Sequence, residues 1–398
     1  MNVIGVVGEF NPFHLGHLAH FEKSRERLGG DAPIVCVMSG DFVQRGGPAC
    51  YNKHVRAEMA LRAGADLVFE LPLPWCVSSA ERFALGAVGL LDSLGVVTHL
   101  SFGSEAGSLA PLTALALAAS EPETIQRVKE QMESGMPFAA AREKVLHETL
   151  GEEARLLQTP NNILAVEYLK AIFSLRSKME PVTTLRRESR HDALAGGRIR
   201  SAGQLRTMLE AGEDIAPFVP AESAKIAARE RAAGRGPVTV EGMEIAVMSR
   251  LRMLSQEDFR ALPDATEGLG NRLYRAARDQ SSLMGVLAAV KTKRYPLSRL
   301  RRMVFSAALG IRADMGGALP PYARLLASSE RGRTLLRTMV REGKLPILNK
   351  PAGIKTLMEP AAEIFALTAA ARDFYVLGYG AAGERAGGSD WRTSPVLG

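Results

Sequence analysis

Four short apolar runs, separated by helix-like stretches, occupy the first 105 residues of this 398-residue chain. The runs are NVIGVVG (2–8), PIVCVMSG (33–40), DLVFELP (66–72) and VTHLSFG (97–103). The helical patterns between them cover 17–28, 52–64 and 79–94. Continuous apolar runs are typical of strands buried on both faces, and strands that alternate with helices form parallel sheets. The sequence therefore predicts an α/β fold built on a Rossmann-like parallel sheet.

The rest of the chain is richer in helical patterns. Residues 107–176 look mostly helical, and PVTTLRR (181–187) is strand-like again. From about residue 215 the pattern is helical, and the end after Gly378 is rich in Gly, Ser and Arg, which predicts fraying. We expect a Rossmann-like domain over 1–214 with a helical insertion at about 107–176. A mostly α-helical domain follows over 215–398.

Composition narrows the class of protein. No apolar segment approaches the roughly 20 residues that cross a bilayer, and the N-terminus lacks the pattern of a secretory signal. Cys36, Cys50 and Cys76 form neither a disulfide framework nor a zinc pattern, which favours a reducing cytoplasm. The net charge of +7 favours a polyanionic partner, although this surplus is small for such a length.

The segment EFNPFHLGHLAH (9–20) follows the first apolar run directly. It falls at the carboxyl end of a predicted parallel strand, where open α/β sheets bind ligands. A helix that begins near Gly16 or His17 points its free N–H groups at an anion. Gly16 lets a phosphate approach the backbone, and His14 and His17 can donate hydrogen bonds to phosphate oxygens. This favours a nucleotide site. Two alternatives remain, a metal-binding histidine pair and simple core packing, although no other cluster completes a metal site.

A second segment, IRSAGQLR (199–206), has the pattern of another phosphate-binding element. Ser201 is placed as a helix N-cap, and Arg206 lies about one turn further on. The motif is common when it stands alone, and Gly203 is a poor helix former within its first turn. Combined with the His-x-Gly-His loop, it resembles the two-part signature of the HIGH-type nucleotidyltransferase superfamily.

Polar residues between these motifs are predicted to reach the same sheet edge. Gln44 and Arg45 precede a Gly-Gly-Pro turn, and Lys53 and Arg56 share a face of the next helix. We interpret these four residues as an anion- or substrate-facing loop, the alternative for Lys53 and Arg56 being a solvated basic helix face.

Three further positions complete the predicted nucleotide site. Gly103 ends a strand where a base or ribose can approach. Asn161 and Asn162 stand at the start of a helix. They either present an amide to the ligand or merely cap that helix. Either Arg186 or Arg187, at the end of a later strand, can reach the nucleotide.

Several segments, taken in order, resemble the tRNA(Met) cytidine acetate ligase family. They are GEFNPFHLGHLAH, SGDFVQRGGPA, GADLVFELP, FGSE, PNNILAVEYLKA and the SAGQLR motif. EGLGNRLYRAA (267–277) and KTKRYPLSRLRRMVFSAALG (291–310) extend the resemblance into the helical half, so that it covers most of the chain. The ordered combination is far more specific than any single motif.

The resemblance implies an activity. Members of this family use ATP and acetate to form acetyl-adenylate with release of pyrophosphate, and then acetylate N4 of the wobble cytidine of elongator tRNA(Met). His14 and His17 would stabilise the transition state of adenylyl transfer, in which acetate is the nucleophile. No protein metal site is implied, and Mg²⁺ would arrive with ATP. Carried over by position, the ATP site comprises Val7, Gly8, Glu9, Phe10, Asn11, Pro12, Phe13, His14, Leu15, Gly16, His17, Leu18, Ala19, His20, Gly103, Asn161, Asn162, Arg186, Arg187, Ser201 and Arg206. The segment after Arg187 reads ESRHDALAGG rather than a Gly-Tyr-His-type stretch, which leaves the choice between the two arginines open.

A basic run in the helical half fits an RNA partner. It contains no acidic residue and comprises Lys291, Lys293, Arg294, Tyr295, Arg299, Arg301 and Arg302. Basic side chains can follow phosphates, and the aromatic ring can stack on an unpaired base. We expect this run to contact tRNA, the alternative being a solvated helix end.

Two other functions remain open. The chain could be a small-molecule adenylyl- or cytidylyltransferase of the same superfamily, but the long helical half argues against this. It could also be a non-catalytic RNA-binding protein, but the intact nucleotide motifs argue against that.

Overall fold

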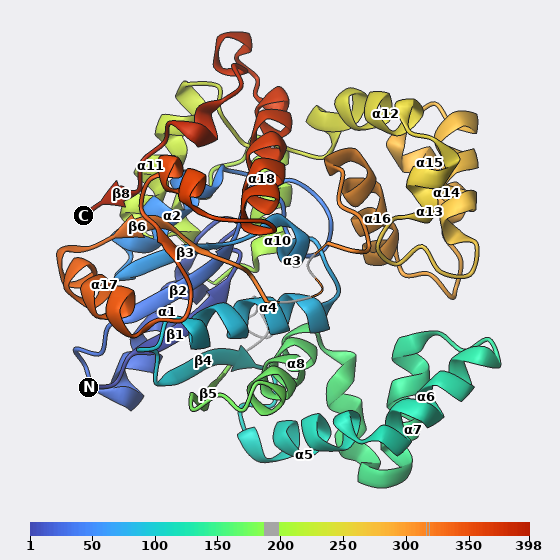
Figure 1. The fold of residues 1–398 in the computed structure, drawn as a ribbon, viewed down its shortest axis with the longest axis horizontal. Helices are drawn as coiled ribbons and strands as arrows, with labels where there is room; N and C mark the ends of the chain where they lie inside the picture. The colour runs from blue at the N-terminus through green and yellow to red at the C-terminus, as the bar shows by residue number, and fades with distance from the viewer. Residues whose placement is uncertain (187–198, 316, 318) are drawn as a thin grey trace.

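A mostly parallel sheet forms the centre of the computed structural model, which describes residues 1–186, 199–315, 317 and 319–398 (Figure 1). The strand order is β5-β4-β1-β2-β3-β6-β7, and β8 pairs with β6 outside this path. Strands β1 to β5 are parallel to one another, whereas β6 runs antiparallel to β3. The bounds are β1 Ile4–Gly8, β2 Ile34–Ser39, β3 Leu67–Leu71, β4 His99–Ser104, β5 Glu180–Leu185, β6 Ala323–Ser328, β7 Ile347–Leu348 and β8 Val396–Leu397. The expected α/β fold class and all five predicted strands are confirmed.

Alternate residues of the central strands face two different cores. In β2, Val35 and Val37 belong to one apolar cluster, whereas Ile34, Cys36 and Met38 belong to the other. Every residue of β2 and β3 is buried. Helices on both faces exclude water, which explains why these strands read as unbroken apolar runs.

The helices that accompany the sheet begin close to where the sequence places them. In the N-terminal part they are α1 Leu15–Leu28, α2 Lys53–Arg62, α3 Leu73–Cys76, α4 Ala80–Ser93, α5 Leu109–Ser120, α6 Pro122–Glu133, α7 Phe138–Leu150 and α8 Pro160–Ser174. Later in the chain follow α10 Ala202–Glu210, α11 Ala221–Ala232, α12 Glu244–Met253, α13 Gln256–Arg260, α14 Leu269–Asp279, α15 Leu283–Val290 and α16 Leu297–Leu309. The last two long helices are α17 Glu330–Glu342 and α18 Ala361–Tyr375.

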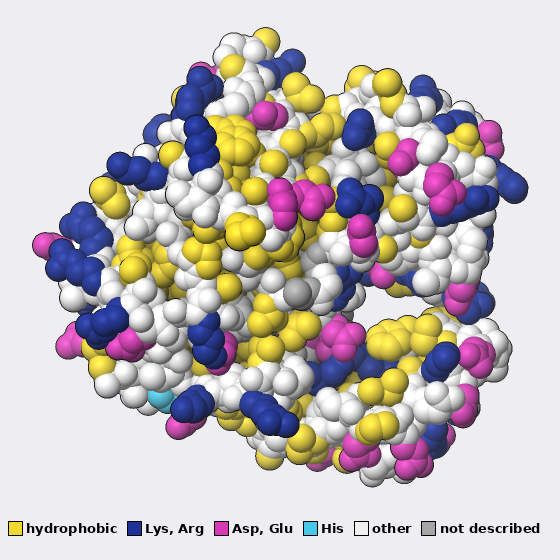
Figure 2. All heavy atoms as spheres, in the orientation of Figure 1, with side chains coloured by type: hydrophobic (Ala, Val, Ile, Leu, Met, Phe, Trp, Pro, Cys, Tyr) yellow, Lys and Arg dark blue, Asp and Glu magenta, His cyan; other side chains and the backbone are white. Residues whose placement is uncertain are grey.

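Two helical lobes stand off the sheet on the side towards which β4 points (Figure 1). One contains α6 and α7 of the helical insertion, and the other contains α12 to α16, which we call the α12–α16 lobe. Figure 2 shows an opening between the two lobes. At the outer end they touch, where Arg294 donates a hydrogen bond to the Met132 carbonyl at 3.4 Å.

The C-terminal part returns to the sheet, which the sequence patterns did not predict. Strands β6, β7 and β8 all follow residue 322, and the last residues pair with β6 instead of fraying. The reason is a buried ionic cluster. Arg324 and Lys53 both contact the carboxylate of Asp390, at 2.6 and 2.8 Å.

The same cluster corrects the prediction for Lys53. Its side chain is fully buried, and Nζ also lies 2.8 Å from Glu70 Oε1. Lys53 therefore faces neither a substrate nor solvent, and it joins the C-terminal segment to the parallel sheet.

None of the described helices combines the length and the apolar character needed to cross a membrane.

Replacing Lys53 with Met should lower the free energy of unfolding by about 3–5 kcal/mol, because Glu70 and Asp390 would lose a buried counter-charge. Urea unfolding measures the change. The matched control is Lys344→Met, which removes an exposed pair with Asp92 and should cost at most about 1 kcal/mol. Equal losses in the two variants would contradict the structural role of Lys53.

Candidate nucleotide site

The order of the strands creates a crevice beside β1. The chain passes from β1 to β2 and β3 on one side, and later places β4 and β5 on the other. Open α/β sheets bind ligands at such a switch point, beyond the carboxyl ends of the strands. The loop after β1 and Gly103 in β4 therefore reach the same edge, as the sequence predicts.

His14 forms the N-cap of α1. Its extended backbone (φ −137°) lets Nδ1 accept a hydrogen bond from the Gly16 N–H at 3.0 Å. The His14 N–H in turn donates to His17 Nδ1 at 3.3 Å. The two rings stack with centroids 3.9 Å apart. Because both Nδ1 atoms accept hydrogen bonds, each neutral ring carries its proton on Nε2. The sequence analysis expected the helix to start slightly later and did not identify this cap.

Burial keeps the histidines of the opening loop neutral. Burial, with smaller contributions from the nearby Arg186 and Arg206, lowers the pKa of His14 from 6.5 to about 3. Burial likewise lowers the pKa of His17 well below its ordinary value and that of His20 to about 4. Protonation then favours the unfolded chain, so these residues reduce stability as the pH falls below about 6.5 and cost nothing above it.

Among the described residues, one buried histidine nitrogen of the opening loop is left without a partner. His14 Nε2 is buried and makes no hydrogen bond with any described residue. By contrast, the ring of His20 is held by Thr184 Oγ1 at 2.9 Å and lies 3.4 Å from the Ser101 carbonyl. A buried, unpaired donor at a helix N-terminus fits an anionic oxygen and is costly if nothing binds there. Within the described ranges, no cluster of three or more His, Cys, Asp or Glu could hold a metal ion.

Aromatic side chains support the loop from beneath. Phe10 and Phe13 are buried, and their rings lie 5.1 and 5.3 Å from the His17 ring. Phe21 from α1 packs against both. Since this apolar floor fixes the ring of His17, the side chains of the loop meet a ligand in a preorganised arrangement. The other residues between Val7 and His20 of the predicted ATP site belong to this loop, to the end of β1 and to the start of α1.

The second motif reaches the first through Arg206. Ser201 caps α10 in a capping box with Gln204, as the sequence predicts, and the cap offsets the poor helix propensity of Gly203. Arg206 donates from Nη1 to the Asn11 carbonyl at 2.9 Å. The guanidinium therefore stands beside the opening loop, where it can balance the charge of a phosphate chain.

A third group assembles at the end of β4. Arg186 lies beside Gly103 and donates to Asn161 Oδ1 at 3.1 Å. Glu105 orders both asparagines, because its carboxylate accepts from Asn161 Nδ2 at 2.6 Å and from the Asn162 N–H at 2.8 Å. Glu105 was missed as a site residue, although it ends the quoted FGSE segment. Arg187 lies outside the described residues.

The Gln44 segment is tied to the opening loop. The Gln44 N–H donates to Glu9 Oε1 at 2.8 Å, and Arg45 is exposed. Arg56 corrects the prediction. Its buried guanidinium donates to main-chain carbonyls at the ends of β1 and β2, including Glu9, Ser39 and Gly40, and therefore holds the loops in place rather than facing an anion.

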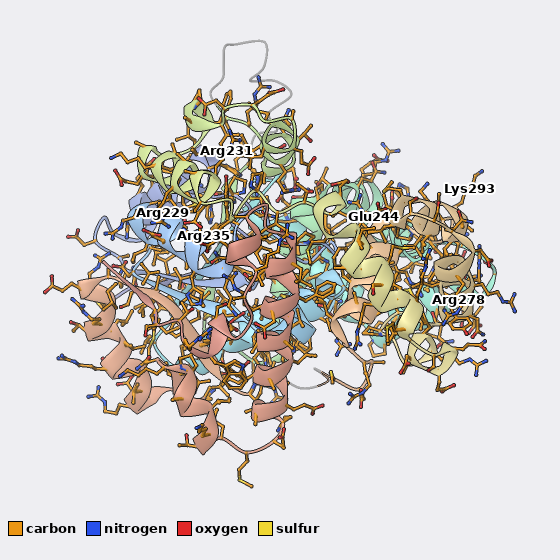
Figure 3. The ribbon with its side chains drawn as sticks, turned by 90° about the horizontal axis from the view of Figure 1, so that it is seen from above. Arg229, Arg231, Arg235, Glu244, Arg278 and Lys293 are labelled. Carbon is orange, nitrogen blue, oxygen red and sulfur yellow. The ribbon has the colours of Figure 1, made fainter. Side chains whose placement is uncertain are left out.

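Much of the basic run is neutralised within the protein. Tyr295 is buried, and its hydroxyl donates to Glu267 at 3.1 Å, so it is not free to stack on a base. Arg294 pairs with Glu267 as well. Arg299 and Arg302 contact residues of the 264–266 loop. Lys291 and Lys293 at the start of the run are exposed, whereas Arg294, Arg299, Arg301 and Arg302 are partly buried. Figure 3 shows Lys293 at the outer end of the lobe.

Replacing Gly16 with Ala should weaken ATP binding about tenfold or more, because an added Cβ would lie 2.8 Å from His14 Cε1. Calorimetric titration with ATP measures the effect. The control is Gly30→Ala, where no atom lies within 4 Å of the added Cβ, and binding should not change. Unaltered affinity in the Gly16 variant would contradict the role of this cap.

Comparisons with known proteins agree with this geometry. A family model described as HIGH Nucleotidyl Transferase matches residues 1–390. Two proteins named tRNA(Met) cytidine acetate ligase are similar over nearly the whole chain. That of Caldanaerobacter subterraneus is 38% identical and covers 95% of this chain and 96% of its own length. That of Acetivibrio thermocellus is 34% identical over the full length of both.

A solved structure is also similar. It is the Thermotoga maritima TmcAL bound with alpha-thio ATP, which is 33% identical, superposes with a TM-score of 0.93, and covers 100% of this chain and 99% of its own. The apo form of the same protein matches equally well, at 32% identity. On this evidence, the chain belongs to the tRNA(Met) cytidine acetate ligase family of HIGH nucleotidyl transferases.

Proposed function

We propose that this protein is an ATP-dependent ligase that activates acetate as acetyl-adenylate and acetylates N4 of the wobble cytidine of elongator tRNA(Met). The observation that carries the proposal is the unpaired Nε2 donor of His14, at the start of α1 and at the switch point of the sheet. Three buried, unpaired cysteines and the need for ATP and tRNA support our proposal that the reaction takes place in the cytoplasm.

The first step joins acetate to AMP. An acetate oxygen attacks the α-phosphorus of ATP, a new P–O bond forms, and the bond to pyrophosphate breaks. Negative charge grows on the phosphoryl oxygens, where the Nε2–H donor of His14 and the α1 N-terminus stabilise it. Arg206 and Arg186 flank the loop and supply positive charge for the phosphate chain. Because His14 stays neutral, it acts as a hydrogen-bond donor rather than as an acid.

The second step transfers the acetyl group. The cytidine N4 attacks the acetyl carbon, a C–N bond forms, the C–O bond to AMP breaks, and N4 loses a proton. We assign the ATP-handling steps to the sheet edge and tRNA recognition to the helical lobes beside it. The opening between the lobes lies on the side of the sheet towards which β4 points (Figures 1 and 2).

A panel of carboxylates in ATP–pyrophosphate exchange tests the first step. The wild-type protein should exchange label with acetate and much less with larger acids. His14→Ala should reduce the rate about a hundredfold or more, with a smaller change in the ATP dissociation constant. His14→Gln, which can keep one donor, should recover part of the rate.

His147→Ala is the control, because this exposed histidine lies in the helical insertion, and its exchange should match the wild type. Exchange with no acid, together with turnover of a phosphate ester, would favour a small-molecule transferase instead. RNA binding without any turnover would favour a non-catalytic RNA-binding protein.

The exposed start of the basic run offers a test of tRNA contact that avoids residues with structural partners. Lys291→Ala combined with Lys293→Ala should weaken tRNA(Met) binding several-fold and reduce the slope of log K against log salt by about 1 to 2. Fluorescence anisotropy over a range of salt concentrations measures both. Lys350→Ala with Lys355→Ala is the charge-matched control, and equal effects in the two double variants would exclude a specific contact.

A further inference from the structure

A small cavity lies at the seam between the nucleotide-binding sheet and the α12–α16 lobe. The space open to the centres of water molecules is about 40 Å³, which holds about three waters or one small oxyanion. From the sheet side it is lined by Ser79 and Arg82 at the start of α4. From the lobe it is lined by Arg302 and Ser306 of α16 and by Asp264.

Two polar groups in this cavity lack the partners that burial normally demands. Ser306 is fully buried, and its Oγ makes no hydrogen bond with any described residue. Arg302 Nε is also buried and unpaired in the part of the chain that the structure describes. Buried hydroxyl and guanidinium groups are rarely left unsatisfied, because the lost hydrogen bonds with water are costly. The Ser306 hydroxyl, with Arg302 Nε also in the cavity lining, therefore suits a ligand that accepts hydrogen bonds.

The cavity is a better match for an anion than for a cation. The cavity lies at the N-terminus of α4, whose positive dipole end favours an anion, and Ser79 Oγ accepts from the Arg82 N–H at 3.3 Å. Two arginines outweigh the single carboxylate of Asp264, which accepts from Arg302 Nη2 at 3.2 Å. Arg82 Nη2 is already engaged with the Met315 carbonyl at 2.7 Å. Donors therefore remain in excess.

The cavity adjoins the ATP loop without being part of it. Gln44 Nε2 donates to the Ser78 carbonyl at 2.9 Å, while the Gln44 N–H donates to Glu9 in the opening loop. The backbone of α16 at Arg301 and Arg302 also packs against Gly46, where an added Cβ would lie 2.5 Å from it. An anion bound here would touch the lobe and the sheet at once. Gln44 would connect it to the nucleotide loop.

We propose that this seam cavity, formed by the α4 N-terminus, Arg302 and Ser306, binds a phosphate-class oxyanion. The oxyanion is either a phosphodiester of the bound RNA or free inorganic phosphate. The first source rests on the proposed function, because it requires tRNA as substrate. The second does not.

Ser306→Ala is the primary test, because it removes a hydroxyl that has no protein partner and should leave the fold intact. Ser223→Ala is the matched control, since Ser223 in α11 is equally buried and its Oγ is also unpaired among the described residues, but it lies outside the cavity. The first readout is the rise in melting temperature caused by inorganic phosphate in the presence of a saturating ATP analogue. The second is the tRNA(Met) dissociation constant.

We expect Ser306→Ala to lose most of the phosphate-induced rise, to bind tRNA about tenfold more weakly, or both, while Ser223→Ala behaves as the wild type. Loss of the phosphate response alone assigns the cavity to free phosphate, and loss of tRNA affinity alone assigns it to the RNA backbone. Arg302→Gln should act in the same direction and reduce the salt slope of tRNA binding by about 1.

If Ser306→Ala matches Ser223→Ala in both readouts, water fills the cavity and the proposal is wrong. The proposed function fails separately. It fails if the wild-type protein makes no acetylcytidine, and the phosphate response can be measured in that case as well.

Discussion

β1 pairs in parallel with β2 on one side and with β4 on the other, and this double pairing sets the position of the opening loop and of Gly103. Because the chain builds outward from β1 in both directions, the loops after β1 and β4 meet at one edge without crossing. The opening loop, Gly103 and Arg186 are brought together by this order, although they are far apart in the sequence. Arg56 then fixes the strand ends by donating to their carbonyls.

At that edge, the N-cap of α1 serves both the fold and the proposed reaction. A serine or aspartate at this position would cap the helix equally well. A histidine caps it with Nδ1 and keeps a second nitrogen, Nε2, for a ligand. Burial prevents protonation, so the ring offers one donor of fixed direction over the physiological pH range. The His14 side chain therefore accepts a hydrogen bond from an N–H group at the helix end and also presents a donor to developing negative charge.

The sequence predicts features that depend on local spacing. The five parallel strands, the loop at the carboxyl end of β1 and the Ser201 cap were all anticipated, because each follows from neighbouring residues. The errors concern charged and aromatic residues whose environment is set by distant parts of the chain. Lys53 is buried because Asp390, more than 300 positions away, returns to pair with it. Tyr295 is buried, and its hydroxyl donates a hydrogen bond to Glu267. No local pattern distinguishes such residues from an exposed basic stripe. Strands β6 to β8 were not predicted either, because they lie in a region whose sequence pattern is otherwise helical, and β7 and β8 have only two residues each.

In the proposed reaction, this edge of the sheet activates acetate for transfer to the wobble cytidine of elongator tRNA(Met). The most direct measurement is mass spectrometry of the nucleosides from purified tRNA(Met) after incubation with the protein, ATP and isotope-labelled acetate. We expect labelled N4-acetylcytidine, dependent on both ATP and acetate and absent from tRNA in which the wobble base is changed. Unlabelled cytidine at that position, from a protein that is folded and binds ATP, would contradict it.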